Sequence, residues 1–168
     1  TIYGQGFGNV RGQTKVIFRT DNEADYNFPE ECATSVWSDN QIVVKVPRYA
    51  LEGMNALKIV FADRPYISAS EPFQVTDDPL PPSICKISPT VARPGTPIQV
   101  WGEYFRAYDN SLSRFKFSQN INATTTNWSY NNSNGYSSAT STLPTSTVSG
   151  PVQIINGTGA SNSLNLQV

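Results

Sequence analysis

Histidine is absent from this 168-residue sequence, and cysteine and charged residues are scarce. The absence of histidine removes the commonest general base and the commonest metal ligand, which argues against an enzyme. Charged residues make up only 15% of the chain, with a net charge of -1 and no Lys/Arg cluster of the kind that phosphate contacts need. No apolar run approaches the roughly 18 residues that span a bilayer. We therefore expect neither nucleic-acid binding nor direct membrane insertion.

The chain contains an internal repeat. The segment 2–7 (IYGQGF) matches 100–105 (VWGEYF) at an offset of 98 residues, and 73–75 (FQV) matches 166–168 (LQV) at an offset of 93. Between these segments, short β-branched and aromatic runs alternate with Gly, Pro, Asn and Asp, a pattern typical of strands. No helix of ten or more residues is expected. Short, regularly spaced strands in repeats of this size favour an all-β fold of two β-sandwiches.

The repeat predicts a first domain over residues 1–76 and a second over residues 84–168. Residues 77–83 form a Pro-rich linker, which should be semi-rigid because proline fixes φ. Each predicted domain holds one cysteine, Cys32 in the first and Cys85 in the second, which excludes a bridge within one domain. A disulfide between the domains, free thiols and bonds to another chain all remain open.

The second repeat opens with Ile87-Ser88-Pro89 and continues through a Gly-led turn at Gly95 to a strand ending in Gly-x-x-Phe at 102–105. This opening resembles the IPT/TIG family of immunoglobulin-like, early-set domains. The first repeat carries the middle of the family pattern at 36–47, so the resemblance covers nearly the whole chain. It implies two tandem immunoglobulin-like β-sandwiches. Members occur as spacers in bacterial surface proteins. They also occur in receptor ectodomains, beside starch-acting catalytic domains and in Rel-type transcription factors.

The similarity is greatest to the tandem modules of bacterial surface proteins, which implies an extracellular or cell-surface location. In the second repeat, a strand and a turn precede the segment that matches residues 2–7. The first repeat begins at Thr1, directly in that matching strand. We therefore expect the first sandwich to lack its N-terminal strand, which would expose backbone at a sheet edge. Either the sequence is an excerpt from a longer array, or another subunit supplies the strand by β-augmentation.

An aromatic and amide-rich segment, 128–136, is longer than its counterpart in the first repeat. Loops often carry binding residues on a rigid scaffold, and aromatic rings stack on sugar faces. We predict a ligand surface for glycan or protein there, formed by Trp128, Tyr130, Asn132 and Tyr136. Trp101, by its position in the repeat, is expected in the core.

Three carboxylates in five residues, Asp21, Glu23 and Asp25, form an oxygen-rich cluster that could hold calcium. The glycine and terminal Glu of an EF-hand loop are missing, so a solvated acidic loop is the alternative, and no other cofactor is expected. The glycines of Gly4-x-Gly6-x-Gly8 predict a strand-ending turn with positive φ, because a strand follows them where a phosphate loop needs a helix. Four triplets satisfy the N-glycosylation rule, if the source makes this modification: Asn122, Asn127, Asn131 and Asn156.

These features predict a non-catalytic structural spacer or assembly module of a surface stalk, adhesin or filament. Its partners would be neighbouring modules of the same chain or other subunits of the filament. The alternative is a glycan- or protein-binding module that uses the segment 128–136.

Overall fold

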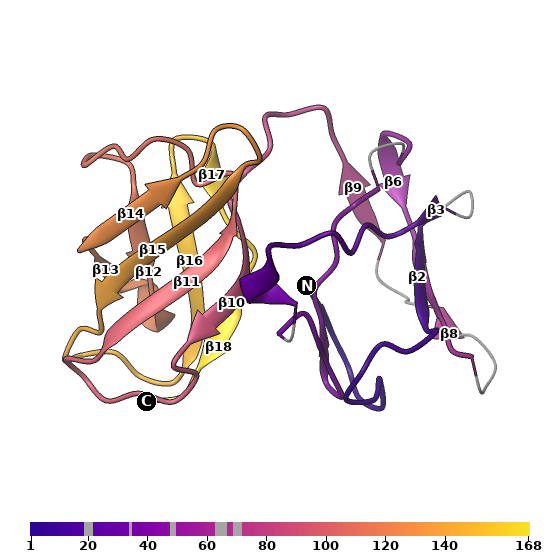
Figure 1. Ribbon diagram of the computed structural model, residues 1–168, viewed down its shortest axis with the longest axis horizontal. Helices are drawn as coiled ribbons and strands as arrows, with labels where there is room; N and C mark the ends of the chain where they lie inside the picture. The colour runs from indigo at the N-terminus through magenta and orange to yellow at the C-terminus, as the bar shows by residue number, and fades with distance from the viewer. Residues whose placement is uncertain (19–21, 34, 48–49, 63–66, 69–71) are drawn as a thin grey trace. The chain divides into compact units, whose positions relative to one another are not determined.

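The computed structural model describes the whole chain except residues 19–21, 34, 48–49, 63–66 and 69–71 (Figure 1). The regular structure of the described part is antiparallel β-sheet, and its two helical segments are short 3-10 turns: η2 (Glu30–Cys32) and η3 (Ser118–Asn120). This confirms the predicted all-β class. None of the described residues forms a helix long and apolar enough to cross a membrane. Two compact units are distinguished: unit 1 comprises residues 1–27 and 36–78, and unit 2 comprises 28–35 and 79–168.

Unit 1 is built from three small antiparallel sheets with the strand orders β1-β5-β4, β3-β2-β7-β8 and β6-β9. Its strands are β1 (Ile2–Tyr3), β2 (Lys15–Phe18), β3 (Asn22–Glu23), β4 (Trp37–Ser38), β5 (Gln41–Ile42), β6 (Gly53–Asn55), β7 (Leu57–Val60), β8 (Ile67–Ser68) and β9 (Phe73–Val75). They enclose a core formed by Phe7, Val16, Phe18, Ala24, Trp37, Ile42, Ile59 and Phe61. The strand β1 lies at the edge of its sheet.

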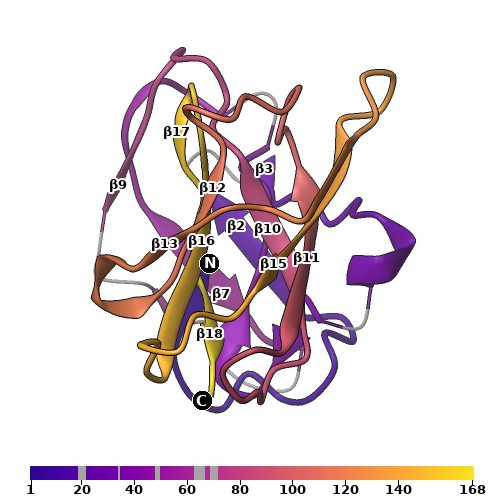
Figure 2. The same ribbon diagram turned by 90° about the vertical axis from the view of Figure 1, so that its left-hand side faces the viewer.

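Unit 2 is a sandwich of two layers, which Figure 2 shows with β12 and β16 in one layer and β11 and β15 in the other. The first sheet has the order β10-β11-β15-β14, and the second has the order β13-β12-β16-β17, with β18 also paired to β16. The strands are β10 (Ser83–Ser88), β11 (Pro97–Glu103), β12 (Arg114–Lys116), β13 (Asn122–Ala123), β14 (Asn127–Tyr130), β15 (Tyr136–Thr142), β16 (Gly150–Asn156), β17 (Gly159–Ala160) and β18 (Leu164–Leu166).

Alternation along β11 decides which face of the first sheet meets the core of unit 2. Ile98 and Val100 are fully buried, whereas Gln99 and Trp101 are only partly buried on the opposite face. The prediction that Trp101 lies in the core is therefore wrong. Its indole faces outward, where the Lys86 ammonium lies 5.1 Å from the ring centroid.

The matching strands of the two repeats hold different positions in their sheets. β11 lies between β10 and β15, whereas β1, its repeat counterpart, pairs with β5 at a sheet edge.

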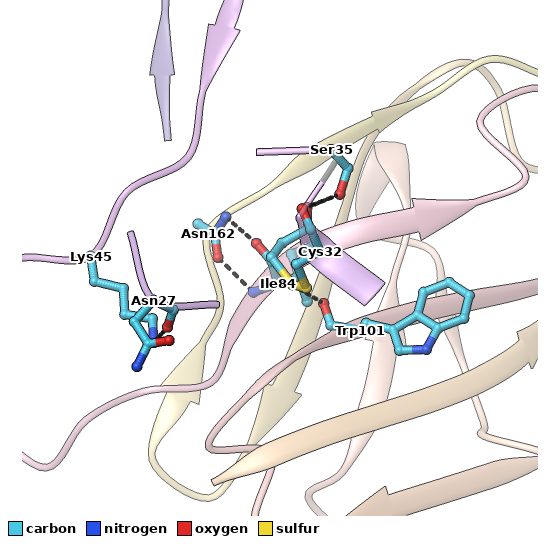
Figure 3. The surroundings of a disulfide bond; sticks show 8 residues. Asn27, Cys32, Ser35, Lys45, Ile84, Trp101 and Asn162 are labelled. Carbon is cyan, nitrogen blue, oxygen red and sulfur yellow. Dashed lines mark hydrogen bonds between the residues drawn. A yellow bond between two sulfur atoms is a disulfide. The ribbon is translucent and has the colours of Figure 1, made fainter. Parts of the chain in front are cut away.

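The cysteines differ from expectation in their placement. The segment 28–35 belongs to unit 2, although its sequence lies within the first repeat. Cys32 of η2 forms a disulfide with Cys85 of β10, with Cα atoms 5.5 Å apart, and the Ser35 hydroxyl lies 3.1 Å from the carbonyl oxygens of both cysteines (Figure 3). The sequence argument that excludes a bridge within one unit is therefore wrong, because it assigns Cys32 to the first domain by chain position alone.

The glycine-rich turn of unit 1 has the predicted positive φ angles, 78° at Gly6 and 83° at Gly8. The Asp39 carboxylate accepts the backbone N–H groups of both glycines, at 3.4 and 3.0 Å, and the Asp39 carbonyl accepts the N–H of Phe7 at 3.0 Å. This confirms a strand-ending turn with positive φ at Gly6 and Gly8, whereas Gly4 does not have the predicted positive φ. Its donors are satisfied by the protein itself, so the turn has no phosphate-binding geometry.

Candidate functional site

The predicted ligand segment 128–136 forms a hairpin in unit 2, with β14 and β15 as its arms and residues 131–135 as its tip. The tip is ordered by hydrogen bonds from the Asn131 N–H to the Tyr136 carbonyl and from the Gly135 N–H to the Asn131 carbonyl, each 2.8 Å long. The Ser133 N–H also donates to the Asn131 side-chain oxygen at 2.9 Å. The hairpin tip is therefore a defined structure that can present side chains in fixed positions.

Strand register separates the four predicted ligand residues into two groups. Trp128 lies opposite Ala139, and Tyr130 lies opposite Ser137. Because Ala139 and Ser137 are buried, Trp128 and Tyr130 share the inner face of the sheet, at its edge strand. The Tyr130 hydroxyl donates to the side-chain oxygen of exposed Asn132 at 3.1 Å.

Tyr136 belongs to the other group, because its neighbour Ser137 points into the core. It pairs with Glu103 and lies on the outer face, the same face as Trp101. The structure thus brings Trp128, Tyr130 and Asn132 together and leaves Tyr136 on the opposite side of the sheet.

Trp128 is half-buried and supports the turn that follows β11. Its indole N–H donates to the Arg106 carbonyl at 2.8 Å. Its ring packs against Phe105 at 5.4 Å and against Tyr108 at 5.6 Å, in tilted arrangements. Such tilted pairs are the favoured geometry for aromatic side chains. Much of the Trp128 ring is therefore used to position its neighbours.

The exposed rings of this region come from the turn itself. Tyr104 is 36% exposed and Tyr108 is 44% exposed. Tyr104 is held against the hairpin tip, since its N–H donates to the Gly135 carbonyl at 2.9 Å and its ring covers Gly135, where an added Cβ would lie 3.3 Å away. The sequence prediction missed both tyrosines. We use the name aromatic edge for the set Tyr104, Arg106, Tyr108, Trp128, Tyr130 and Asn132.

Arg106 is the charged residue of the aromatic edge, and Asp109 directly follows its member Tyr108 in the sequence. Arg106 is exposed and takes part in neither of the two ion pairs found among the described residues, which both involve Glu23. Hydrogen bonds from the hydroxyl and N–H of Ser111 lower the pKa of the exposed Asp109 carboxyl. Asp109 is thereby tied into its own turn, and the Arg106 guanidinium is left to solvent.

The acidic cluster of unit 1 is only partly described, because Asp21 lies outside the described residues. The Glu23 carboxylate pairs with Arg11 at 3.5 Å and with Lys15 at 3.0 Å, and the Asp25 carboxylate accepts the N–H of Asn27 at 2.7 Å. No group of three or more metal-binding side chains occurs within the described part of the chain. Calcium binding stays a prediction.

The four glycosylation candidates differ in accessibility. Asn122, Asn127 and Asn131 are exposed, whereas Asn156 is only 6% exposed. The Asn156 amide nitrogen donates to the carbonyls of Tyr104 and Phe105 at 3.1 and 3.0 Å. A glycan on Asn156 would break these bonds, so the folded protein offers no acceptor there.

A shallow groove of about 510 Å³ also lies on unit 2, lined by Thr90, Val91, Ser149, Gly150, Asn165, Leu166 and Gln167. It shares no residue with the aromatic edge. Its lining holds no charged side chain, so it offers hydrogen bonds and apolar contact but no ionic recognition.

No family model matches this sequence, and no similar sequence is found among curated proteins. Among solved structures, the chain is similar to the surface glycan-binding protein PbSGBP-B from Prevotella bryantii, with 17% identity, a TM-score of 0.39, and coverage of 98% of this chain and 34% of that one. A protein crystallised with xylogluco-oligosaccharide has 17% identity and a TM-score of 0.36, with coverage of 98% and 36%. Domains 4 and 5 of the S-layer protein SbsC have 13% identity and a TM-score of 0.29, with coverage of 98% and 72%. The chain thus spans about a third of the first two proteins, and similarities this weak carry no argument about function.

Proposed function

We propose that this chain is a non-catalytic carbohydrate-binding module of an extracellular or cell-surface protein, and that the aromatic edge of unit 2 is its binding surface. One observation carries the proposal: two exposed tyrosine rings are held against the hairpin, Tyr104 over Gly135 and Tyr108 against Trp128. The exposed amide of Asn132, at the hairpin tip, adds a hydrogen-bonding group. A sugar ring presents a C–H face that packs on an aromatic ring, and hydroxyl groups that pair with amides. Tyrosine supplies rigid contact area at a low cost in conformational entropy.

The carboxylates of residues 79–168 support binding in place of hydrolysis. There are two in this range, Glu103 and Asp109, and the other two carboxylates of unit 2, Glu30 and Glu31, lie on η2 next to Cys32. Glu103 is 4% exposed, and the Asp109 carboxylate is hydrogen-bonded by Ser111. Hydrolysis of a glycosidic bond ordinarily needs two carboxyl groups that flank it from the two sides of a cleft. A buried carboxylate and one tied into a turn do not form such a pair.

The disulfide supports the extracellular location. Cys32 and Cys85 are both almost fully buried and bonded to each other. Structural disulfides persist in secreted proteins and at cell surfaces, and are rare in the reducing cytosol. The same covalent link favours a second candidate function, that of a structural spacer in a surface stalk or filament of IPT/TIG-like modules, because it limits how far the chain can extend under load.

A glycan-array experiment on the oxidised full chain tests the proposal. We expect at least one saccharide to bind, and Tyr108→Ala to weaken that binding by tenfold or more, a loss of about 1.4 kcal/mol. The matched control is Tyr3→Ala, which removes an exposed tyrosine of unit 1 and should bind as the parent does.

Two outcomes would contradict the proposal. If no saccharide binds, the spacer function is favoured. If a saccharide binds equally well to the parent and to Tyr108→Ala, the binding surface lies elsewhere on the chain.

A further inference from the structure

The same turn occurs in both repeats but is made from different residues. Gly6-Phe7-Gly8 of unit 1 corresponds to Tyr104-Phe105-Arg106 of unit 2. The first and third residues have positive φ in each turn, 78° and 83° in unit 1 and 61° and 62° in unit 2. The central phenylalanine is buried in both units, with exposed fractions of 9% and 0%.

Unit 2 therefore has side chains at two positions where unit 1 has glycine. Glycine adopts positive φ without strain, whereas a residue with a Cβ is strained there by contact with the neighbouring carbonyl. The fold alone would favour glycine at both positions, since neither side chain is buried: Tyr104 and Arg106 are both exposed. The strained residues thus serve something other than the core.

Neighbouring side chains hold the strained turn in place. The buried Asn156 amide donates to the carbonyls of Tyr104 and Phe105, at 3.1 and 3.0 Å. The Trp128 indole donates to the Arg106 carbonyl at 2.8 Å. Strain of this kind persists only where the surroundings over-determine the backbone, and it is concentrated at ligand sites.

We infer that Tyr104 and Arg106 together recognise an anionic saccharide, one that carries a carboxylate or sulfate group. This inference rests on the proposed function and adds the chemical class of the ligand. The Tyr104 ring would pack on the sugar face, and the Arg106 guanidinium would bind the anionic group through paired, charge-assisted hydrogen bonds.

The charge of the surrounding sequence favours such a ligand. Unit 2 contains five Lys/Arg and four Asp/Glu, and two of these acids, Glu30 and Glu31, lie on η2 next to Cys32. Of the two acids in residues 79–168, Glu103 is buried, and Asp109 accepts hydrogen bonds from Ser111. Arg106 is therefore an exposed cation with no ion pair among the described residues, and an anionic ligand would supply its partner.

The test is a binding titration of the oxidised full chain against a panel of anionic oligosaccharides, each with a neutral counterpart. Oligogalacturonate is paired with its methyl ester, and sulfated oligosaccharides are paired with their desulfated forms. We expect at least one anionic member to bind tenfold or more tightly than its counterpart. Arg106→Gly, which restores the unit 1 residue, should abolish this preference, and Tyr104→Gly should weaken both members of the pair. Arg93→Ala removes another exposed arginine of unit 2 and should change neither.

Melting temperatures separate the binding role from a structural one. Because glycine relieves the strain, Arg106→Gly should melt at the parent temperature or a few degrees above it. A clear fall in melting temperature would show that the Arg106 side chain stabilises the fold, and would overturn the strain argument. Equal binding of every anionic and neutral pair would overturn the anionic ligand while leaving carbohydrate binding intact. The absence of binding to any saccharide, charged or neutral, would instead refute the proposed function.

Discussion

Removal of the disulfide should cost a large part of the stability of this protein. The Cys32–Cys85 bond joins positions 53 residues apart. In the chain-entropy relation, a closed loop of that length lowers the entropy of the unfolded chain by roughly 14 cal/mol/K, or about 4 kcal/mol at 25 °C. Small domains have total free energies of unfolding of only about 5–15 kcal/mol. Reduction of the bond should therefore lower the free energy of unfolding by about 4 kcal/mol, and the double variant Cys32→Ala/Cys85→Ala should lower it by at least as much.

Urea unfolding followed by tryptophan fluorescence measures this loss directly. The parent should unfold at lower urea concentrations when reductant is present, and the double alanine variant should behave the same with and without reductant. The variant also removes two buried sulfur atoms, which adds a packing loss to the entropic one. Comparison of the reduced parent with the variant isolates that packing contribution.

Loss of the disulfide should also make segment 28–35 more susceptible to proteolysis. It belongs to unit 2, and the disulfide is its covalent attachment there. We expect limited proteolysis to cut this segment in the reduced protein before other described parts of the chain. The reasoning would be refuted if reduction lowered the free energy of unfolding by less than about 1 kcal/mol and left 28–35 resistant to proteolysis. The disulfide would then hardly constrain the unfolded chain.

Two further predictions concern unit 2. Gly102→Ala would place a Cβ 1.8 Å from the Ser83 carbonyl oxygen and force β10 away from β11, so we expect a loss of about 3 kcal/mol or more in urea unfolding. Gly157→Ala, whose Cβ would meet only a flexible side chain at 3.2 Å, should change stability little, and equal losses in the two variants would contradict this account. The lowered pKa of Asp109 means that its ionised form stabilises the folded turn above the unfolded-state pKa, and that this stabilisation is lost as pH falls through the folded-state pKa. Ser111→Ala should raise the Asp109 pKa toward its ordinary value in an NMR titration, and an unchanged pKa would show that the Ser111 hydroxyl has no such role.

The fold class could be predicted from sequence because its signals are local. Alternating apolar residues and turn residues determine strands over a few positions, and the turn at Gly6 and Gly8 followed from the conformational freedom of glycine. The same alternation places Trp101 correctly. Ile98 and Val100 are buried on one face of the strand, so Trp101 must lie on the opposite face. Position in the repeat predicts a core residue at Trp101, whereas the alternation along the strand predicts the outer face, and the structure follows the alternation.

The cysteine placement and much of the candidate site could not be predicted in this way. Segment 28–35 joins unit 2 through tertiary contacts, which leave no periodic signal in the sequence. Tyr104 and Tyr108 lie in the turn that follows β11, outside the aromatic segment 128–136 that the sequence singles out, and the tertiary contacts that join the turn to the hairpin leave no local sequence signal. The signal was present in the repeat, where the glycines of one turn are replaced by Tyr104 and Arg106 in the other.

A two-dimensional NMR titration of the isotope-labelled, oxidised full chain with a saccharide that binds on the array tests the central claim most directly. We expect the resonances of Tyr104, Arg106, Tyr108 and Asn132 to shift together and to saturate at one ligand concentration. Shifts confined to another surface, such as the groove at Val91 and Gln167, would contradict the assignment of the aromatic edge as the carbohydrate-binding surface.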